Sequence, residues 1–154
     1  MNSLGGKTPT GHGVAGTAAD VFEVQEGDKR YTVIRFIGDY GANPRLFPAV
    51  SAVEGFLSNP MVPGLHPLVE IIEESAALVY ETGLVWTLAE VLVMIGTEEP
   101  AGVRAALELA ADLARLLEEA SIAGSDQGVL CHGSLTPDRV VLDAQGRVGL
   151  IGHG

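Results

Sequence analysis

Four short apolar runs with a strand-like composition occur in the first eighty or so residues of the chain. They are rich in β-branched and aromatic residues, which favour strands, and turn-forming residues join them in pairs. Between the two pairs, residues 44–57 place apolar side chains three and four positions apart, which predicts a short helix. This part of the chain is therefore expected to form a sheet with one helix. The four predicted strands are residues 21–25, 30–37, 68–73 and 76–80.

The second half of the chain has helical patterns and ends in a predicted hairpin. Thr87 precedes an apolar run and Glu90 follows three positions later, which is the spacing of a capping box and predicts the start of a helix. Residues 100–120 form the strongest helical pattern, because a proline occupies the first turn and one narrow polar stripe interrupts an otherwise apolar surface. Such a helix needs packing partners on more than one side. The stripe comprises Arg104, Glu108, Asp112, Arg115 and Glu119.

The composition indicates a folded, acidic protein. The chain has 154 residues, of which 47% are hydrophobic and 19% charged, so it can bury a core and is not dominated by disorder. The order of the patterns, with strands before helices, predicts an α+β fold. The formal net charge is −11 and no cluster of Lys and Arg occurs, which disfavours nucleic acid and highly anionic ligands as partners.

The sequence patterns favour a cytoplasmic protein. No apolar run approaches the ~18 residues of a membrane span. The start of the chain lacks the basic and apolar regions of a signal peptide. A single cysteine, Cys131, excludes an internal disulfide and fits a reducing compartment. We therefore expect a cytoplasmic location and no membrane partner, and we expect residues 1–13, which are rich in Gly, Thr and Ser, to form a flexible tail.

The end of the chain, CHGSLTPDRVVLDAQGRVGLIGHG, resembles the catalytic hairpin of protein kinases. Residues 132–143 are similar to the catalytic loop H-R-D-L-K-P-E-N and the apolar strand after it, and residues 148–154 are similar to the strand that leads into D-F-G. Upstream segments resemble other kinase elements in the same order. They are residues 16–24 (the glycine-rich loop of bacterial Ser/Thr kinases), 31–36 (the third strand), the segment around Glu54 (the αC helix), 65–69 (H-P-N-I-V), 78–81 (the strand into the hinge) and 100–120 (the αE helix).

This resemblance implies a kinase-like fold over residues 14–154. Residues 14–82 would form the N-lobe, a five-stranded antiparallel sheet with an αC-like helix. Residues 83–154 would form a partial helical lobe that ends at the position of D-F-G. The activation segment and most of the helical lobe have no counterpart, so the resemblance describes a truncated domain or one whose helical lobe lies in another polypeptide.

At the catalytic positions of the family, this chain carries residues of different chemistry. Ser134 takes the place of the catalytic aspartate, and a serine cannot act as a base near neutral pH. Arg139 takes the place of the metal-binding asparagine and Gly152 that of the D-F-G aspartate, so two protein ligands of Mg²⁺ are missing. The resemblance therefore implies a site without catalytic residues, metal ligands or a cofactor. His132 is expected to be a packed, hydrogen-bonded structural histidine.

The phosphate-binding positions depend on how the strands are aligned with the family. In the third strand, either Ile34 or Arg35 takes the place of the conserved lysine of the family, and Arg35 could form a structural ion pair with Glu54. GHGVAG at residues 11–16 satisfies G-x-G-x-x-G, which is a weak signal alone. Alignment on the second strand instead puts the three glycine positions at Val14, Gly16 and Ala19.

The function implied by the resemblance is that of a pseudokinase, a catalytically inactive regulatory or scaffolding module that binds a protein. The helix of residues 100–120 would be partly uncovered, and exposing a few hundred Å² of apolar surface costs several kcal/mol at about 25 cal/mol per Å². We therefore expect a homodimer or an obligate partner. An alternative is a metal-independent nucleotide sensor, or a weakly active atypical kinase, in which Arg35 or Arg139 holds phosphates. The expected partner face comprises Val103, Leu107, Leu109, Leu113 and Leu116.

Overall fold

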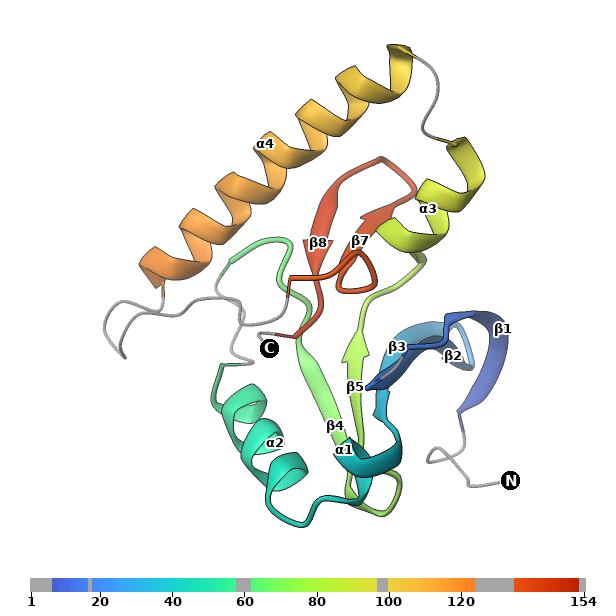
Figure 1. Cartoon of the computed structure of the whole chain (residues 1–154), viewed down its shortest axis with the longest axis vertical. Helices are drawn as coiled ribbons and strands as arrows, with labels where there is room; N and C mark the ends of the chain where they lie inside the picture. The colour runs from blue at the N-terminus through green and yellow to red at the C-terminus, as the bar shows by residue number, and fades with distance from the viewer. Residues whose placement is uncertain (1–6, 17, 58–61, 97–99, 124–134, 153–154) are drawn as a thin grey trace. The chain divides into compact units, whose positions relative to one another are not determined.

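The computed structural model describes residues 7–16, 18–57, 62–96, 100–123 and 135–152, which form two compact units (Figure 1). The first unit contains the described residues up to 57 and His66–Leu84, and the second contains residues 62–65 and the described residues from Val85 onward. The first is a five-stranded antiparallel sheet with helices, and the second contains two helices and a small sheet. The predicted α+β class is confirmed.

The sheet of the first unit has the strand order β1-β2-β3-β5-β4, and every neighbouring pair is antiparallel. A two-residue turn at Gly27 and Asp28 joins β2 to β3, and a short 3₁₀ helix, Glu73–Ser75, joins β4 to β5. The elements of this unit are β1 (Thr8–Val14), β2 (Ala19–Glu26), β3 (Lys29–Phe36), α1 (Gly38–Ala42), α2 (Leu46–Leu57), β4 (Leu68–Ile72) and β5 (Ala77–Glu81).

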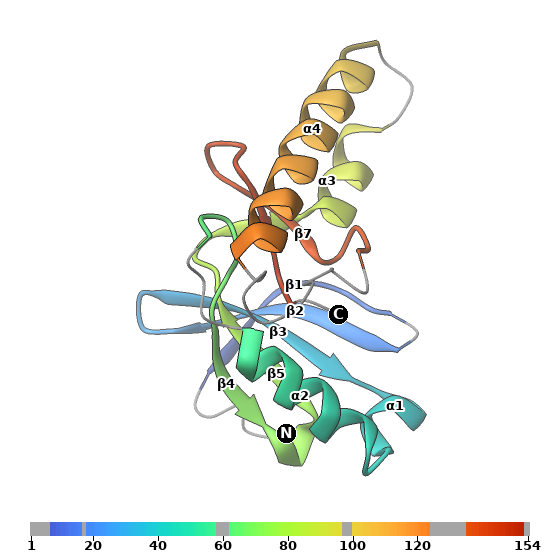
Figure 2. The ribbon, with the colours of Figure 1, turned by 90° about the vertical axis from the view of Figure 1, so that its left-hand side faces the viewer.

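Both faces of the central strands are covered. One face carries a cluster of buried side chains from β2, β3 and β5, against which Phe22 and Ile72 pack. The other face carries Ile34 and Leu78, which are paired across β3 and β5 and fully buried. Helix α2 lies against the sheet (Figure 2), and its Phe47 ring meets Phe36 of β3 edge to face, with ring centroids 5.9 Å apart. The cluster on the first face comprises Val24, Tyr31, Val33, Ala77 and Val79.

Strand β1 corrects the expectation of a flexible tail over residues 1–13. Thr8–Val14 pairs with β2, so the prediction is wrong for residues 8–13, while residues 1–6 lie outside the described residues. The register shifts between Pro9 and Gly13, and Gly11 has a φ of +88°. Lys7 anchors the start of this strand through an ion pair with Glu70. The strand lies at the edge of the sheet and has no alternating apolar pattern, which is why it escaped prediction.

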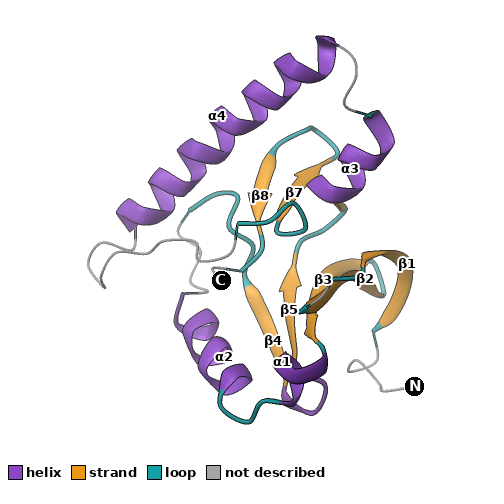
Figure 3. Ribbon diagram, viewed as in Figure 1, coloured by secondary structure: helices purple, strands orange, loops and turns teal. Residues whose placement is uncertain are grey.

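The second unit contains two helices and a three-stranded antiparallel sheet with the order β6-β7-β8, and Figure 3 shows the two helices with the β7–β8 hairpin. Helix α3 starts with the predicted capping box: the Thr87 hydroxyl accepts from the Glu90 N–H, and the Glu90 carboxylate accepts from the Thr87 N–H at 2.8 Å. Strand β6 was not predicted. The elements are β6 (Val85–Thr87), α3 (Leu88–Ile95), α4 (Pro100–Ala123), β7 (Val140–Asp143) and β8 (Val148–Leu150).

The core of the second unit is formed by Val62, Leu116, Val140 and Leu150. Residues 62–65 belong to this unit although the sequence assigned them to the N-lobe, because the Leu150 N–H donates to the Gly64 carbonyl at 2.8 Å. Gly64 has a φ of +97°, and a Cβ there would lie 3.1 Å from Leu116. Among the helices of the described residues, none is long and apolar enough to cross a membrane.

Candidate functional site

The face of the sheet on which each side chain lies bears on the choice between Ile34 and Arg35 for the lysine position. Residues that are cross-strand partners share a face, and Ile34 pairs with Leu78 while Thr32 pairs with Tyr80. Tyr80 reaches Glu54 of α2 through a hydrogen bond, so Ile34 lies on the α2 side of the sheet. Arg35 lies on the opposite side. Of the two alignments, the structure favours the one with Ile34 at the lysine position, where an apolar side chain is fully buried.

Arg35 has a different partner from the one considered on the sequence. Its guanidinium Nη2 donates to Asp20 Oδ2 at 2.8 Å, and the guanidinium also lies over the Phe22 ring. Asp20 and Arg35 are direct neighbours across β2 and β3, so the hairpin register brings the two charges together. Arg35 therefore pairs with Asp20 in place of Glu54. As an exposed pair, this contact contributes little to stability.

Glu54 is buried in α2 and hydrogen-bonded. Its side chain is 2% exposed, and its Oε2 accepts from the Tyr80 hydroxyl at 3.0 Å. A buried carboxylate is tolerated only when hydrogen bonds or charges compensate for its loss of water. The tyrosine supplies one of these compensations from the neighbouring strand β5. The sequence predicted Glu54 as the αC-like glutamate but did not predict Tyr80 as a hydrogen-bond partner.

The turn between β1 and β2 keeps one glycine at a position where glycine is required. Gly11 and Gly13 lie within β1, so GHGVAG does not form a phosphate-binding loop over its full length. Gly16 lies in the turn, and a Cβ there would be 2.1 Å from the Ala19 carbonyl oxygen. Val14 ends β1 and Ala19 begins β2. Of Val14, Gly16 and Ala19, the three positions aligned with the glycines of the family, only Gly16 lies in the turn, and it is the only glycine of the three.

The second unit holds the catalytic-loop positions that the structure describes. Arg139 is 9% exposed, and its carbonyl accepts from the Ile151 N–H at 3.0 Å, which ties the loop to the end of β8. Within the described residues, no carboxylate lies within ion-pair distance of its guanidinium. Gly152 is buried and has a φ of +74°, which favours glycine over the aspartate of the family. Ser134 and His132 lie outside the described residues.

No metal-binding cluster is present in the part of the chain that the structure describes. Among these residues, no three His, Cys, Asp or Glu side chains lie close enough together to hold an ion. At two of the positions that bind Mg²⁺ in the family, this chain carries Arg139, whose side chain is a cation, and Gly152, which has no side-chain heavy atom. Neither position therefore offers an oxygen ligand from its side chain.

The turn between β7 and β8 is organised by Asp143. Its Oδ1 accepts from the N–H groups of Gln145 (2.8 Å) and Arg147 (2.9 Å), and its Oδ2 accepts from the Arg147 guanidinium at 2.6 Å. The main-chain N–H of Arg147 lowers the pKa of Asp143, and the side chain of Arg147 and the N–H of Gln145 act in the same direction. The Asp-Ala-Gln-Gly turn of the sequence is thus a carboxylate-centred turn.

Replacing Asp143 by asparagine is expected to lower the melting temperature near neutral pH, and the difference should shrink as the pH falls below about 4. The folded pKa of Asp143 lies below its unfolded value, so the ionised carboxylate stabilises the fold above the unfolded pKa, and this contribution is lost as pH falls through the folded pKa. Melting curves between about pH 3 and 7 measure the effect. Asp28→Asn, in the exposed β2–β3 turn, is the matched control, and an equal pH profile for the two variants would contradict the prediction.

The predicted partner face of α4 is divided between the core and the surface. Leu116 is 6% exposed and belongs to the core, and Leu113 packs partly against it, so neither lies on a free face. Leu109 is half-buried, while Val103 and Leu107 are exposed. Contact with residues 62–65 and β8 covers the C-terminal part of the helix. Of the five residues predicted to form this face, only Val103 and Leu107 in the N-terminal half of α4 are therefore exposed.

Solved kinase domains have an arrangement of elements similar to that of this chain. A double mutant of the PknI kinase domain of Mycobacterium tuberculosis is 17% identical and covers 98% of this chain, with a TM-score of 0.68. The PknI kinase domain without these substitutions gives 17% identity, 98% coverage and a TM-score of 0.60. Another structure of the same domain gives 19%, 96% and 0.62. The chain has a protein kinase-like fold. At these identities the similarity concerns the fold alone.

The kinase-like chain spans about 60% of the length of the PknI domains, with 59%, 60% and 58% of those three covered. No protein-family model matches its sequence, and no curated protein matches it. The predicted kinase-like fold, with its five-stranded N-lobe sheet and partial helical lobe, is thus confirmed by structure.

Proposed function

We propose that this kinase-like chain is a pseudokinase, a non-catalytic module that regulates or scaffolds other proteins by binding them. The observation that supports this most directly is the chemistry at the family's catalytic positions. A buried isoleucine stands for the phosphate-binding lysine, and Arg139 and Gly152 stand for the two metal ligands. A fold can be retained as a binding surface when its chemistry is lost.

In phosphoryl transfer, the phosphate-binding lysine, the metal ligands and the catalytic aspartate have different tasks. None of them can therefore take over the task of another that is missing. The reaction depends on positioned phosphates, on Mg²⁺ that neutralises developing charge, and on a residue that orients the attacking hydroxyl. Ile34 offers no charge to a phosphate, Arg139 repels Mg²⁺, and Ser134 cannot accept a proton near neutral pH. Each step of the reaction has therefore lost its protein contribution.

Charged side chains elsewhere in the kinase-like elements make contacts that serve the fold. Glu54 is bound by Tyr80, Arg35 is paired with Asp20, and Asp143 organises the β7–β8 turn. A single cysteine and an acidic surface fit the cytoplasmic location and the protein partner that we propose. These contacts support a scaffold whose interactions, and not its chemistry, carry the function.

The protein is expected to show no phosphotransfer and no magnesium-dependent binding of ATP. Melting curves are recorded with ATP in the presence of Mg²⁺ and, separately, of EDTA, and transfer of labelled γ-phosphate to the chain itself and to a generic protein substrate is measured. A Kd a hundredfold below the ATP concentration would stabilise the fold by about 2.7 kcal/mol, which such curves readily detect. A saturable shift that requires Mg²⁺ would contradict the proposal.

A metal-independent anion site is the second candidate function, and one observation favours it. Arg139 is nine-tenths buried and, in the described part of the chain, has no acidic partner. A buried cation is stabilised by an anion that binds it. If ATP or inorganic phosphate raises the melting temperature equally with Mg²⁺ and with EDTA, and Arg139→Gln removes the shift, the chain is a metal-independent sensor.

A further inference from the structure

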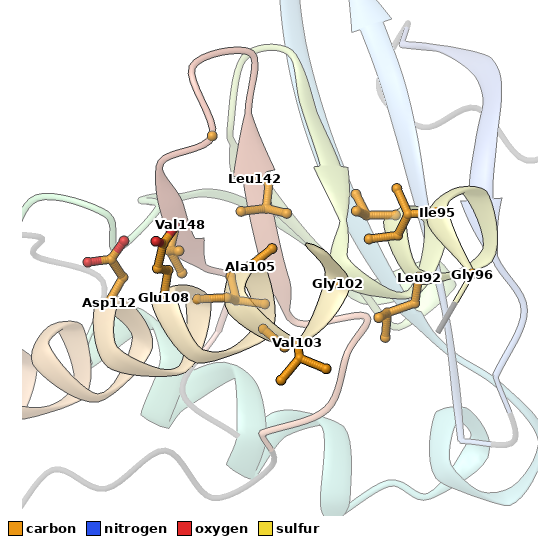
Figure 4. Close-up of a pocket in the computed structure, with 14 residues that line it drawn as sticks. Leu92, Ile95, Gly96, Gly102, Val103, Ala105, Glu108, Asp112, Leu142 and Val148 are labelled. Carbon is orange, nitrogen blue, oxygen red and sulfur yellow. The ribbon is translucent and has the colours of Figure 1, made fainter. Parts of the chain in front are cut away.

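An open apolar groove lies within the second unit, between α3, the N-terminal half of α4 and the β7–β8 hairpin (Figure 4). Its volume is about 470 Å³. Leu92 and Ile95 of α3 and Leu142 of β7 line its walls. Gly102 and Ala105 of α4 also line it, and their small side chains help to keep the groove open.

The apolar side chains around this groove are exposed. Val103, at its edge on α4, is 61% exposed, and Leu92 and Ile95 are exposed by 41% and 60%. Leu107 lies one turn further along α4 from Val103 and is exposed as well. A contiguous exposed apolar surface of this kind marks an interaction site more often than single exposed residues do. The groove thus replaces the one-sided α4 face predicted from the sequence.

The charge of the groove indicates the chemistry of its occupant. Of the residues that line it, Glu108 and Asp112 are charged and both are acidic. Their ion pairs with Arg104 and Arg115 of the same helix are exposed and weak, so an incoming cation can replace these arginines. The sequence of the whole second unit has ten acidic and four basic residues, which leaves it six charges negative. A positively charged partner is attracted to this surface.

We propose that the groove binds an amphipathic helix of another protein, with apolar anchors on one face and basic residues at its ends. This rests on the proposed function as a protein-binding module and names the class of partner. A groove between two helices accepts a third through side chains at i, i+3, i+4 and i+7. Lysine or arginine beside these anchors would meet Glu108 and Asp112.

A second copy of the chain fits this groove less well than a basic helix does. An isologous dimer sets the same patch of each copy against the other, so two concave surfaces would face each other and stay unfilled. The two acidic walls would also approach each other, with like charges on both sides. We therefore assign the groove to a different protein, and a dimer formed through it is an outcome that overturns the proposal.

The probe is a pair of synthetic helical peptides of about 16 residues with leucine at i, i+3, i+4 and i+7. One has lysines at both ends and the other has glutamates there. Binding of each labelled peptide to the whole chain is measured by fluorescence anisotropy at about 0.15 M salt. We expect saturable micromolar binding of the basic peptide and at least about tenfold weaker binding of the acidic one.

Two valines of the same unit give a matched pair of variants. Val103→Glu puts a charge at the edge of the groove, and Val93→Glu puts the same charge on α3, where Val93 is 86% exposed and does not line the groove. Gly102→Leu fills the groove from within, because a Cβ at Gly102 meets open space. We expect Val103→Glu and Gly102→Leu to weaken binding of the basic peptide about tenfold or more, and Val93→Glu to leave it within about twofold.

Each result decides a separate question. Equal binding of the two peptides, or an equal loss of affinity for the basic peptide in Val93→Glu and Val103→Glu, overturns the proposal that the groove binds a basic helix. A dimer seen by sedimentation that Val103→Glu dissociates overturns it too, because a second copy is then the occupant. Circular dichroism confirms that each variant is folded. Magnesium-dependent binding of ATP would refute the proposed function while leaving the peptide measurement standing, so the two proposals fail independently.

Discussion

Replacing Leu116 by alanine is expected to lower the free energy of unfolding by about 2–5 kcal/mol. Leu116 is 6% exposed and lies in the core of the second unit, where Val62, Val140 and Leu150 surround it. Truncation removes buried apolar surface and leaves a cavity that its neighbours fill only partly. Trp86, the single tryptophan, lies on β6 of the same unit and reports unfolding in urea through its fluorescence.

Leu107→Ala is the matched control, because Leu107 is a leucine of the same helix that is 67% exposed. Its stability is expected to stay within about 0.5 kcal/mol of the parent chain. If both substitutions cost the same, the division of α4 into a packed half and an exposed half is wrong. A large loss for Leu107 alone would show that a partner covers the N-terminal half in solution.

The length of α4 and its polar stripe could be predicted from the sequence, but not which apolar side is covered. A helix with apolar residues on several sides has no single amphipathic face, so periodicity cannot assign one. The structure assigns it through residues 62–65 and β8, which meet the helix at Leu116. These segments are distant in sequence, and the glycine at position 64 that lets them approach gives no local signal of its role.

The choice between Ile34 and Arg35 could not be made from the sequence for a related reason. Residues 31–34 of β3 are all buried because both faces of the sheet are covered there, so the run does not alternate and its orientation is hidden. The pairing of β3 with β5 resolves it, through the contact of Tyr80 with Glu54. The Asp20–Arg35 pair, in contrast, follows from the two-residue turn of the β2–β3 hairpin and could have been deduced.

The hairpin that carries the predicted catalytic-loop positions could be predicted well from the sequence. A catalytic loop is recognised by short spacings within one hairpin, and the predicted hairpin is present at β7 and β8. Its function cannot be inferred from the fold, because active and inactive chains can share the same backbone. Only the identity of the side chains at Arg139, Gly152 and Ile34 separates the two cases.

Replacing Tyr80 by phenylalanine is expected to lower the free energy of unfolding by about 1–3 kcal/mol, the range for removing one partner of a buried hydrogen bond. The substitution keeps the aromatic ring, which is buried in the first unit, and removes the hydroxyl that donates to Glu54 Oε2 at 3.0 Å. Glu54 is 2% exposed, so water cannot readily replace the lost donor. Urea unfolding followed by circular dichroism measures the change.

Tyr40→Phe removes the same hydroxyl from a half-exposed tyrosine of the first unit and is expected to change stability by no more than about 0.5 kcal/mol. A neutral Tyr80→Phe would mean that Glu54 does not depend on this donor. The expected loss would show that the αC-like glutamate, whose partner in a catalytic site is a lysine, is held here by a tyrosine while an isoleucine fills the lysine position. In the described part of the first unit, the hydrogen bond between Tyr80 and Glu54 thus joins α2 to the sheet beside a buried apolar side chain, and this arrangement supports the proposed binding module.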